Sequence, residues 1–106
     1  MSNQRPKHYQ SVQQHYPQYI RAIESLGQQC KELGPLDSKQ AHLLQLAAAA
    51  ARGLEGAVHS HCRQALNAGA SPEEIHHCLI ILTTTLGFPA VMAAMSWVND
   101  ILPSQD

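Results

Sequence analysis

The sequence predicts an all-α protein of about five helices, and three observations carry this prediction. No segment alternates apolar and polar residues in the way of a half-buried strand. Proline and glycine divide the chain into segments of helix length, and a run of alanines, the strongest helix formers, occupies residues 47–51. Two segments also begin with helix-capping patterns. In a chain of 106 residues we expect one domain, with an N-terminal helical region over residues 1–34 and a core over residues 35–103.

The first two predicted helices are defined by a proline and by a capping box. Helical structure is expected over residues 7–33, with a break or kink near Pro17, because proline has no N–H to donate within a helix. The next helix is expected over residues 37–52. Its start is indicated by Asp37 and Gln40, whose side chains can each bind the other's backbone N–H.

Three further helices are expected in the second half of the chain. One covers residues 54–68 and ends at Gly69, since glycine readily adopts the left-handed conformation that follows many helices. The next covers residues 71–85 and begins at Ser71, a residue type that caps helix N-termini. The last covers residues 89–102, after a Gly-Phe-Pro turn.

The faces of these helices suggest where the core lies and where apolar surface is left over. At 100° per residue, His61 falls in the middle of an apolar stripe made of Leu54, Ala57, Val58, Ala65 and Ala68. In the following helix, Ile80 and Ile81 point away from the main apolar side. This second apolar surface favours assembly of the chain through helix faces, and the alternative is a central helix covered on both sides.

Charge and composition exclude several classes of function. Seven Lys and Arg against eight Asp and Glu give a net charge of −1, so nucleic acid is not an expected partner. No apolar run approaches the roughly 20 residues of a membrane span, and the polar N-terminus does not read as a secretory signal. The cysteines at positions 30, 62 and 78 have no CxxC or zinc-type spacing. We therefore expect free thiols and a cytoplasmic location.

His61 is the first candidate for chemistry. In an apolar setting the neutral imidazole is favoured, and a neutral imidazole can accept a proton near neutral pH. The alternative is a structural core histidine whose nitrogens are satisfied by a backbone carbonyl or a hydroxyl.

A second candidate cluster lies along one flank of the same helix. Glu55, His59 and Cys62 are spaced i, i+4 and i+7, so a carboxylate, an imidazole and a thiol follow one another along a ridge. Such a neighbourhood could lower the pKa of a thiol and make Cys62 a nucleophile or a peroxide-sensitive residue. Alternatively, the three residues form a partly solvated helix edge.

The sequence predicts no metal site and no cofactor. His59 and His61 lie about 200° apart on a helix and cannot hold one ion. A set of His42, His61 and His77 from three helices is the alternative that would supply three ligands. No phosphate loop, HExxH, GxSxG or dinucleotide fingerprint occurs.

Three stretches carry a resemblance to a known family: LDSKQAHLLQLAAAAARG, HCRQALNAGASPEEI and LGFPAVMAAMSWV. From about Pro35 to Leu102 the chain resembles the carboxymuconolactone decarboxylase family, which also contains the alkylhydroperoxidase AhpD. The resemblance implies an AhpD-like all-helical fold with an antiparallel helix pair in the core. It also implies assembly as a homotrimer or a ring-shaped homohexamer.

The functional residues of the family carry over unevenly. Its redox-active members have a CxxCxxxH motif and a Glu on the preceding helix that assists proton transfer. On this sequence the His falls on His61, the two cysteines fall on Leu54 and Ala57, and the Glu falls on His42. The chain therefore resembles a divergent member that lacks the redox CxxC pair, and a dithiol cycle cannot run through these positions.

The residues and the resemblance together leave three alternative functions. The first is a decarboxylase-like lyase that performs acid/base chemistry on a small carboxylated lactone or organic acid, in a pocket between the second, third and fourth helices. In it His61 is the acid/base, while His42 and Glu55 orient it or hold the substrate. The second is a peroxide-reducing or redox-sensing oxidoreductase that uses Cys62 with His59. The third is a non-catalytic oligomeric binding scaffold.

Overall fold

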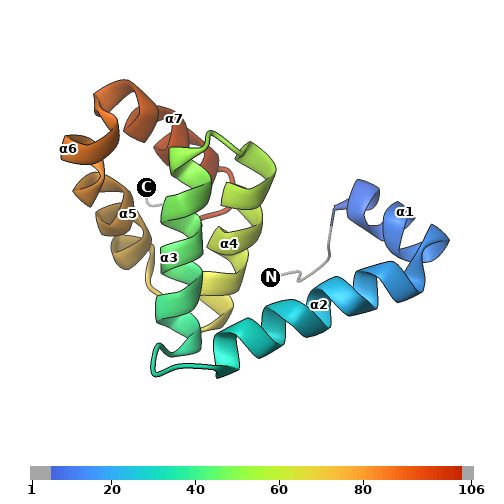
Figure 1. Cartoon of the computed structure of the whole chain (residues 1–106). Coiled ribbons are helices and arrows are strands. Elements are labelled where there is room, and N and C mark those ends of the chain that lie inside the picture. Colours follow the sequence, from blue (N-terminus) through green and yellow to red (C-terminus); the bar gives the residue numbers. More distant parts are fainter. Residues whose placement is uncertain (1–5, 104–106) are drawn as a thin grey trace. The chain divides into compact units, whose positions relative to one another are not determined.

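The protein is all-α, as the sequence predicts. The computed structural model describes residues 6–103, and each regular element in that range is a helix (Figure 1). Residues 1–5 of the expected N-terminal region lie outside the described range. The chain divides into an N-terminal unit and a C-terminal unit, with the border between Leu36 and Asp37.

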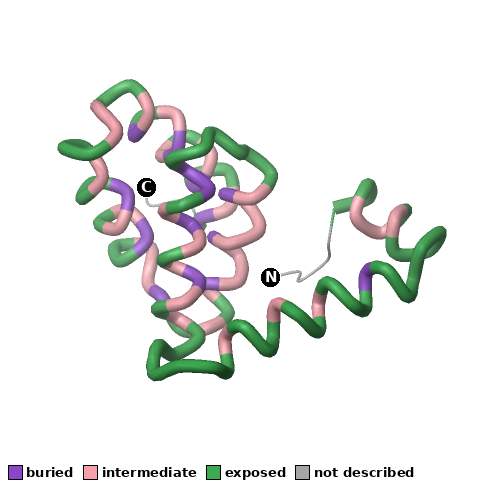
Figure 2. Tube along the Cα trace, in the orientation of Figure 1, coloured by how far each residue is buried: buried purple, intermediate pink, exposed green. Residues whose placement is uncertain are grey.

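The N-terminal unit is a helical hairpin that buries little of itself. Helix α1 covers Lys7–His15 and helix α2 covers Pro17–Glu32, so the expected break at Pro17 separates two helices. The Tyr9 hydroxyl donates a hydrogen bond of 2.6 Å to the carboxylate of Glu24. Among the described residues of this unit, Ile20 alone is buried (Figure 2).

The C-terminal unit contains the remaining helices. They are α3 (Ser38–Ala51), α4 (Glu55–Asn67), α5 (Pro72–Ile81), α6 (Thr83–Leu86) and α7 (Phe88–Asn99). Helices α3 and α4 run antiparallel and make the most extensive contact in the chain, while α7 packs against α3, α4 and α5 (Figure 1). The antiparallel pair of α3 and α4 therefore forms the central contact of the core.

Two capping boxes determine where α3 and α5 begin. The Asp37 carboxylate accepts the backbone N–H of Gln40 at 2.8 Å, and the Gln40 side chain accepts the N–H of Asp37 at 3.0 Å. Ser71 and Glu74 make the same exchange at 3.0 and 2.9 Å. Hydrogen bonding to Ser71, followed by that to Lys39, lowers the pKa of the Glu74 carboxyl.

The second half of the chain departs from the predicted boundaries at two places. The helix expected over residues 71–85 ends at Ile81 and is followed by the short α6. Three successive threonines begin there, and the hydroxyl of Thr83 donates to the carbonyl of Ile80 at 2.7 Å, which competes with continued helix bonding. The last helix ends at Asn99 rather than at residue 102.

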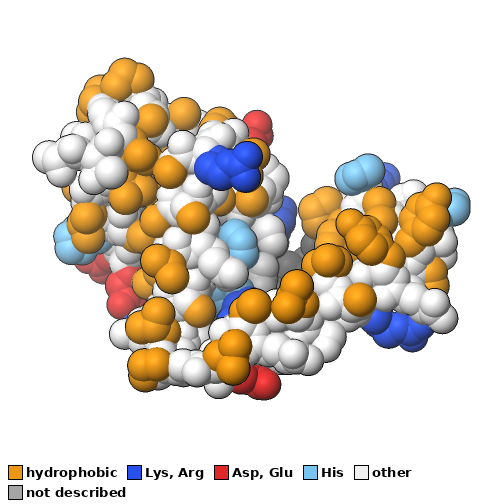
Figure 3. Space-filling model, viewed as in Figure 1, with side chains coloured by type: hydrophobic (Ala, Val, Ile, Leu, Met, Phe, Trp, Pro, Cys, Tyr) orange, Lys and Arg blue, Asp and Glu red, His pale blue; other side chains and the backbone are white. Residues whose placement is uncertain are grey.

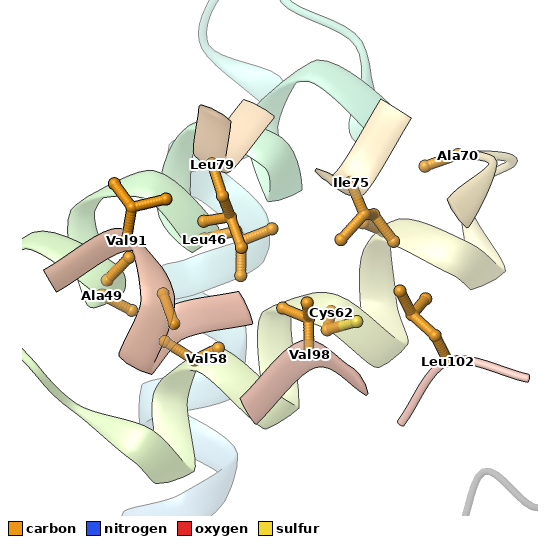
Figure 4. Close-up of a cluster of buried hydrophobic side chains, with 13 residues drawn as sticks. Leu46, Ala49, Val58, Cys62, Ala70, Ile75, Leu79, Val91, Val98 and Leu102 are labelled. Carbon is orange, nitrogen blue, oxygen red and sulfur yellow. The ribbon is translucent and has the colours of Figure 1, made fainter. Parts of the chain in front are cut away.

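The core of the C-terminal unit is aliphatic. Its fully buried side chains come from α3, α4, α5 and α7 (Figure 4), and the largest are Leu46, Val58, Cys62, Ile75, Leu79, Val91 and Val98. The predicted surplus of apolar surface is also present, since Ile80 and Ile81 are 51% and 60% exposed. In the described range, no helix has the length and apolar character needed to cross a bilayer.

Candidate functional site

Two histidine rings face each other between the antiparallel helices α3 and α4. The ring centroids of His42 and His61 are 5.7 Å apart, and the ring planes are tilted by 34°. His42 is buried, with 6% of its surface exposed, whereas His61 is only partly buried. The pair thus joins an interior imidazole to one that reaches toward the surface.

The position of this pair follows from the packing of its two helices. His42 lies one turn before Leu46, whose side chain is fully buried, and His61 directly precedes Cys62, which is also fully buried. The two imidazoles therefore lie at the border of the aliphatic core.

The prediction that His61 lies in the middle of the apolar stripe on α4 is wrong. The buried residues of α4 are Val58, Cys62 and Ala65, while Leu54 is 42% exposed. The stripe is therefore centred near Cys62, and His61 lies at its edge beside His42. The reason is that α4 has α3 on one side and α7 and α5 on another, and a helical wheel does not contain the positions of these neighbours.

The two imidazoles are suited to moving a single proton. Imidazole is the side chain that most readily exchanges a proton near neutral pH. Two imidazolium charges in ring contact repel each other, so His42 and His61 together hold one positive charge more readily than two.

A buried amide oxygen lies one turn along α3 from His42. Gln45 Oε1 is shielded from solvent, and within residues 6–103 no donor reaches it. A buried acceptor without a hydrogen-bond donor costs about 1–3 kcal/mol of folding free energy. Such acceptors are rare in folded proteins, so this one needs an explanation. Gln45 is not among the residues predicted from the sequence, although its i+3 spacing from His42 could have suggested it.

Glu55 does not join the histidine pair. It lies about 120° round the helix axis from His61 and is exposed in the first turn of α4. Its carboxylate is grouped with His59 and Asp100 instead. Nε2 of His59 lies 3.1 Å from Oδ2 of Asp100, which sits at the end of α7. The expected orienting role of Glu55 toward His61 therefore has no geometric support.

The Cys62 thiol lies in the core rather than on a partly solvated helix edge, so that expectation is wrong. Its side chain is 0% exposed and belongs to the buried cluster in Figure 4. Burial raises the pKa of the Cys62 thiol to about 11, and the nearby Arg63 only partly opposes this. A thiol that is protonated at neutral pH and closed to solvent is a poor nucleophile. His59, which pairs with Asp100, does not activate it.

The other two cysteines differ from Cys62 and from each other. The Cys78 thiol donates to the carbonyl of Leu43 at 3.4 Å, and burial raises its pKa. Cys30 is exposed on α2. All three cysteines are free thiols.

The metal set suggested by the sequence is not assembled. His77 is exposed on α5, and the neighbouring His76 binds the Asn99 side chain at 2.8 Å. In the described part of the chain, the three donor groups close enough to share an ion are those of Glu55, His59 and Asp100. Asp100 is not predicted from the sequence, because no local pattern connects it with His59, which lies on a helix far away in the chain.

Comparison with known proteins places the chain in a family. No curated protein matches the sequence. Among solved structures, the chain is similar to a carboxymuconolactone decarboxylase family protein from Legionella pneumophila in its apo form, with a TM-score of 0.74 and 24% identity over 87% of this chain and 82% of the other. At that identity the likeness establishes the fold. A model of the carboxymuconolactone decarboxylase family matches residues 17–100, and so includes α2 as well as the region after Pro35. The chain therefore belongs to the carboxymuconolactone decarboxylase family.

Proposed function

We propose that this protein is a small lyase that uses His61 as its acid/base on a carboxylated lactone or a similar organic acid. The observation that carries the proposal is the ring contact between His42 and His61, in which one imidazole is buried and the other is partly exposed. Membership of the family supports the class of substrate. A cytoplasmic location is part of the proposal and is supported by the three free thiols.

The proposed step is the replacement of carbon dioxide by a proton. Cleavage of the bond to the carboxylate releases carbon dioxide and leaves an electron pair on a carbon conjugated with a carbonyl. The imidazolium of His61 donates its proton to that carbon, and the resulting neutral imidazole regains a proton from solvent. His42 would act as a positioning residue that holds the His61 ring and limits the pair to one charge.

Gln45 is proposed to help hold the substrate. Its buried amide oxygen can accept a hydrogen bond from a hydroxyl or carboxylic acid group of a bound molecule. Binding would then satisfy an acceptor that no described residue satisfies, and this would favour substrates that carry a donor at that position.

A His61→Ala variant tests the acid/base assignment directly. Loss of a general acid is expected to lower kcat by about 10²- to 10⁴-fold, measured as release of carbon dioxide from a panel of carboxylated lactones. His77→Ala, which removes an exposed imidazole on α5, is the matched control. Unchanged turnover in the His61→Ala variant would remove His61 from the mechanism.

We also propose that the chain assembles with copies of itself, as a homotrimer or homohexamer. Apolar side chains spaced alternately by three and four residues are exposed on and beside α2, and we call them the α2 stripe: Tyr16, Tyr19, Ile23, Leu26, Cys30 and Leu33. This spacing is that of a coiled-coil seam, whose natural partner is another helix. Figure 3 shows hydrophobic side chains at the surface along α2.

Sedimentation velocity tests the assembly. The double variant Ile23→Ser, Leu26→Ser is expected to shift the protein toward smaller species, because it removes apolar surface from the middle of the stripe. Gln28→Ser is the matched control, since Gln28 lies about 200° round α2 from Leu26. A monomeric unchanged protein would contradict the proposal.

A further inference from the structure

We propose that Glu55, His59 and Asp100 form a binding site for a divalent transition-metal ion. One donor atom from each residue lies within 4.8 Å of the other two. His59 and His61 are about 200° apart on α4, so this site lies on the opposite side of the helix from the histidine pair. The inference is therefore independent of the proposed acid/base function.

The separation of two donors already fits a shared ion. Ligands that each lie about 2.1 Å from a metal are separated by about 3.0–3.4 Å when the angle between them is square or tetrahedral. Nε2 of His59 and Oδ2 of Asp100 are 3.1 Å apart. An ion can therefore replace their direct contact without a change in the distance between them.

Glu55 is placed to supply the third ligand. It precedes His59 by four residues on α4, so the two side chains lie on the same side of the helix, one turn apart. The Glu55 side chain is exposed, and its carboxylate lies no more than 4.8 Å from the other two donors. Because this side chain is exposed, we expect a change of its rotamer to bring the carboxylate to the ion.

The two helices that carry the donors are held together by the core. Val58 on α4 and Val98 on α7 are both 0% exposed and belong to one buried cluster. Asp100 follows α7 directly, and its backbone N–H binds carbonyl oxygens in the last turn of that helix. The His59 side chain is 22% exposed and the Asp100 side chain 59%. The donors thus have fixed backbones and open contact with solvent, which leaves room for water as a further ligand.

The donor set indicates which ions the site would bind. An imidazole nitrogen favours Zn²⁺, Co²⁺ and Ni²⁺ over Mg²⁺ and Ca²⁺, which prefer oxygen ligands alone. Two carboxylates provide the negative charge that balances a dication. An ion in this position would connect the first turn of α4 with the end of α7, and we expect it to stabilise the folded C-terminal unit.

Calorimetric titration of the full-length, chelator-treated protein with Zn²⁺ tests the site. One ion per chain is expected, with a rise in Tm that grows with the Zn²⁺ concentration. His59→Ala and Asp100→Asn should each weaken Zn²⁺ binding at least tenfold, because the first removes a ligand and the second removes the negative charge of one. Glu55→Gln should weaken it by a smaller factor, since the Glu55 carboxylate lies outside the close contact between His59 and Asp100.

Two control variants separate this site from other zinc-binding groups of the chain. Cys30→Ser removes the exposed thiol, and His77→Ala removes an exposed imidazole on α5; both should bind Zn²⁺ as tightly as the unchanged protein. The proposal is overturned if the unchanged protein, shown to be folded by circular dichroism, binds no Zn²⁺. It is equally overturned if folded His59→Ala and Asp100→Asn variants keep the full affinity, or if the control variants lose it.

Discussion

The N-terminal and C-terminal units are both helical, yet they treat their apolar side chains in opposite ways. In the described part of the N-terminal unit Ile20 is the one buried residue, and the residues of the α2 stripe are exposed. The C-terminal unit buries side chains from four of its helices in one cluster. A pair of helices has too little surface in mutual contact to form a core, whereas helices stacked on several sides can enclose one.

This difference teaches that helix formation and core formation are separate events in this chain. Pro17 and the polar residues around it define helices in the N-terminal unit without the support of a buried cluster. The α2 stripe has the spacing of a helix interface. We therefore expect the stability of the N-terminal unit to depend on another helix that covers this stripe. The C-terminal unit is stabilised by its own buried cluster.

The largest expected difference between the units concerns truncation of a leucine. Leu46→Ala on α3 should lower the free energy of unfolding by about 2–5 kcal/mol, because a fully buried side chain leaves a cavity. Leu26→Ala on α2, where the side chain is 58% exposed, should change it by less than about 0.5 kcal/mol in the dissociated chain. Urea unfolding followed by circular dichroism, at a concentration where the chain is monomeric, measures both. If both substitutions lowered the free energy of unfolding equally, the two units would not differ in how much they bury.

The second prediction compares the thiols of the two units. Burial raises the pKa of Cys62 from its ordinary value near 9.0 to about 11, so the unfolded chain ionises this thiol first. The protonated thiol therefore stabilises the fold below pH 9. This contribution, about 2–3 kcal/mol, is lost as the pH rises to 11.

The test of this prediction is a difference between variants. The free energy of unfolding should fall between pH 9 and pH 11 more steeply in the unchanged protein than in Cys62→Ala. In labelling with a thiol reagent at a concentration where the chain is monomeric, Cys30 should react in the folded state and Cys62 only on unfolding. Rapid labelling of Cys62 in the folded protein would contradict its burial.

The smallest expected effect concerns the start of α5. Ser71→Ala removes the side-chain acceptor of the capping box and should lower the free energy of unfolding by about 1 kcal/mol. In the N-terminal unit neither α1 nor α2 has a side-chain cap hydrogen bond, so no equivalent substitution exists there. Ser71→Thr, which keeps a hydroxyl, should recover most of the loss. A Ser71→Ala variant of unchanged stability would mean that tertiary packing alone determines where α5 begins.

Prediction from the sequence succeeded where the cause is local. Asp37 with Gln40 and Ser71 with Glu74 lie three residues apart, and their hydrogen bonds depend on nothing beyond one helical turn. Gly69 also has the positive φ expected after a helix, at 102°. Prediction failed at residues 82–85, where the choice between continuing α5 and starting α6 depends on small differences among threonine conformations.

The candidate sites divide in the same way. The sequence by itself determined the all-α class and the main helix boundaries, because these depend on short-range hydrogen bonding and on residue type. Only the tertiary structure decided that His61 lies against His42, that Cys62 is buried, and that Asp100 meets His59. These outcomes depend on which helices pack against α4 and on which sides, and contacts between distant segments leave no periodic pattern in the sequence.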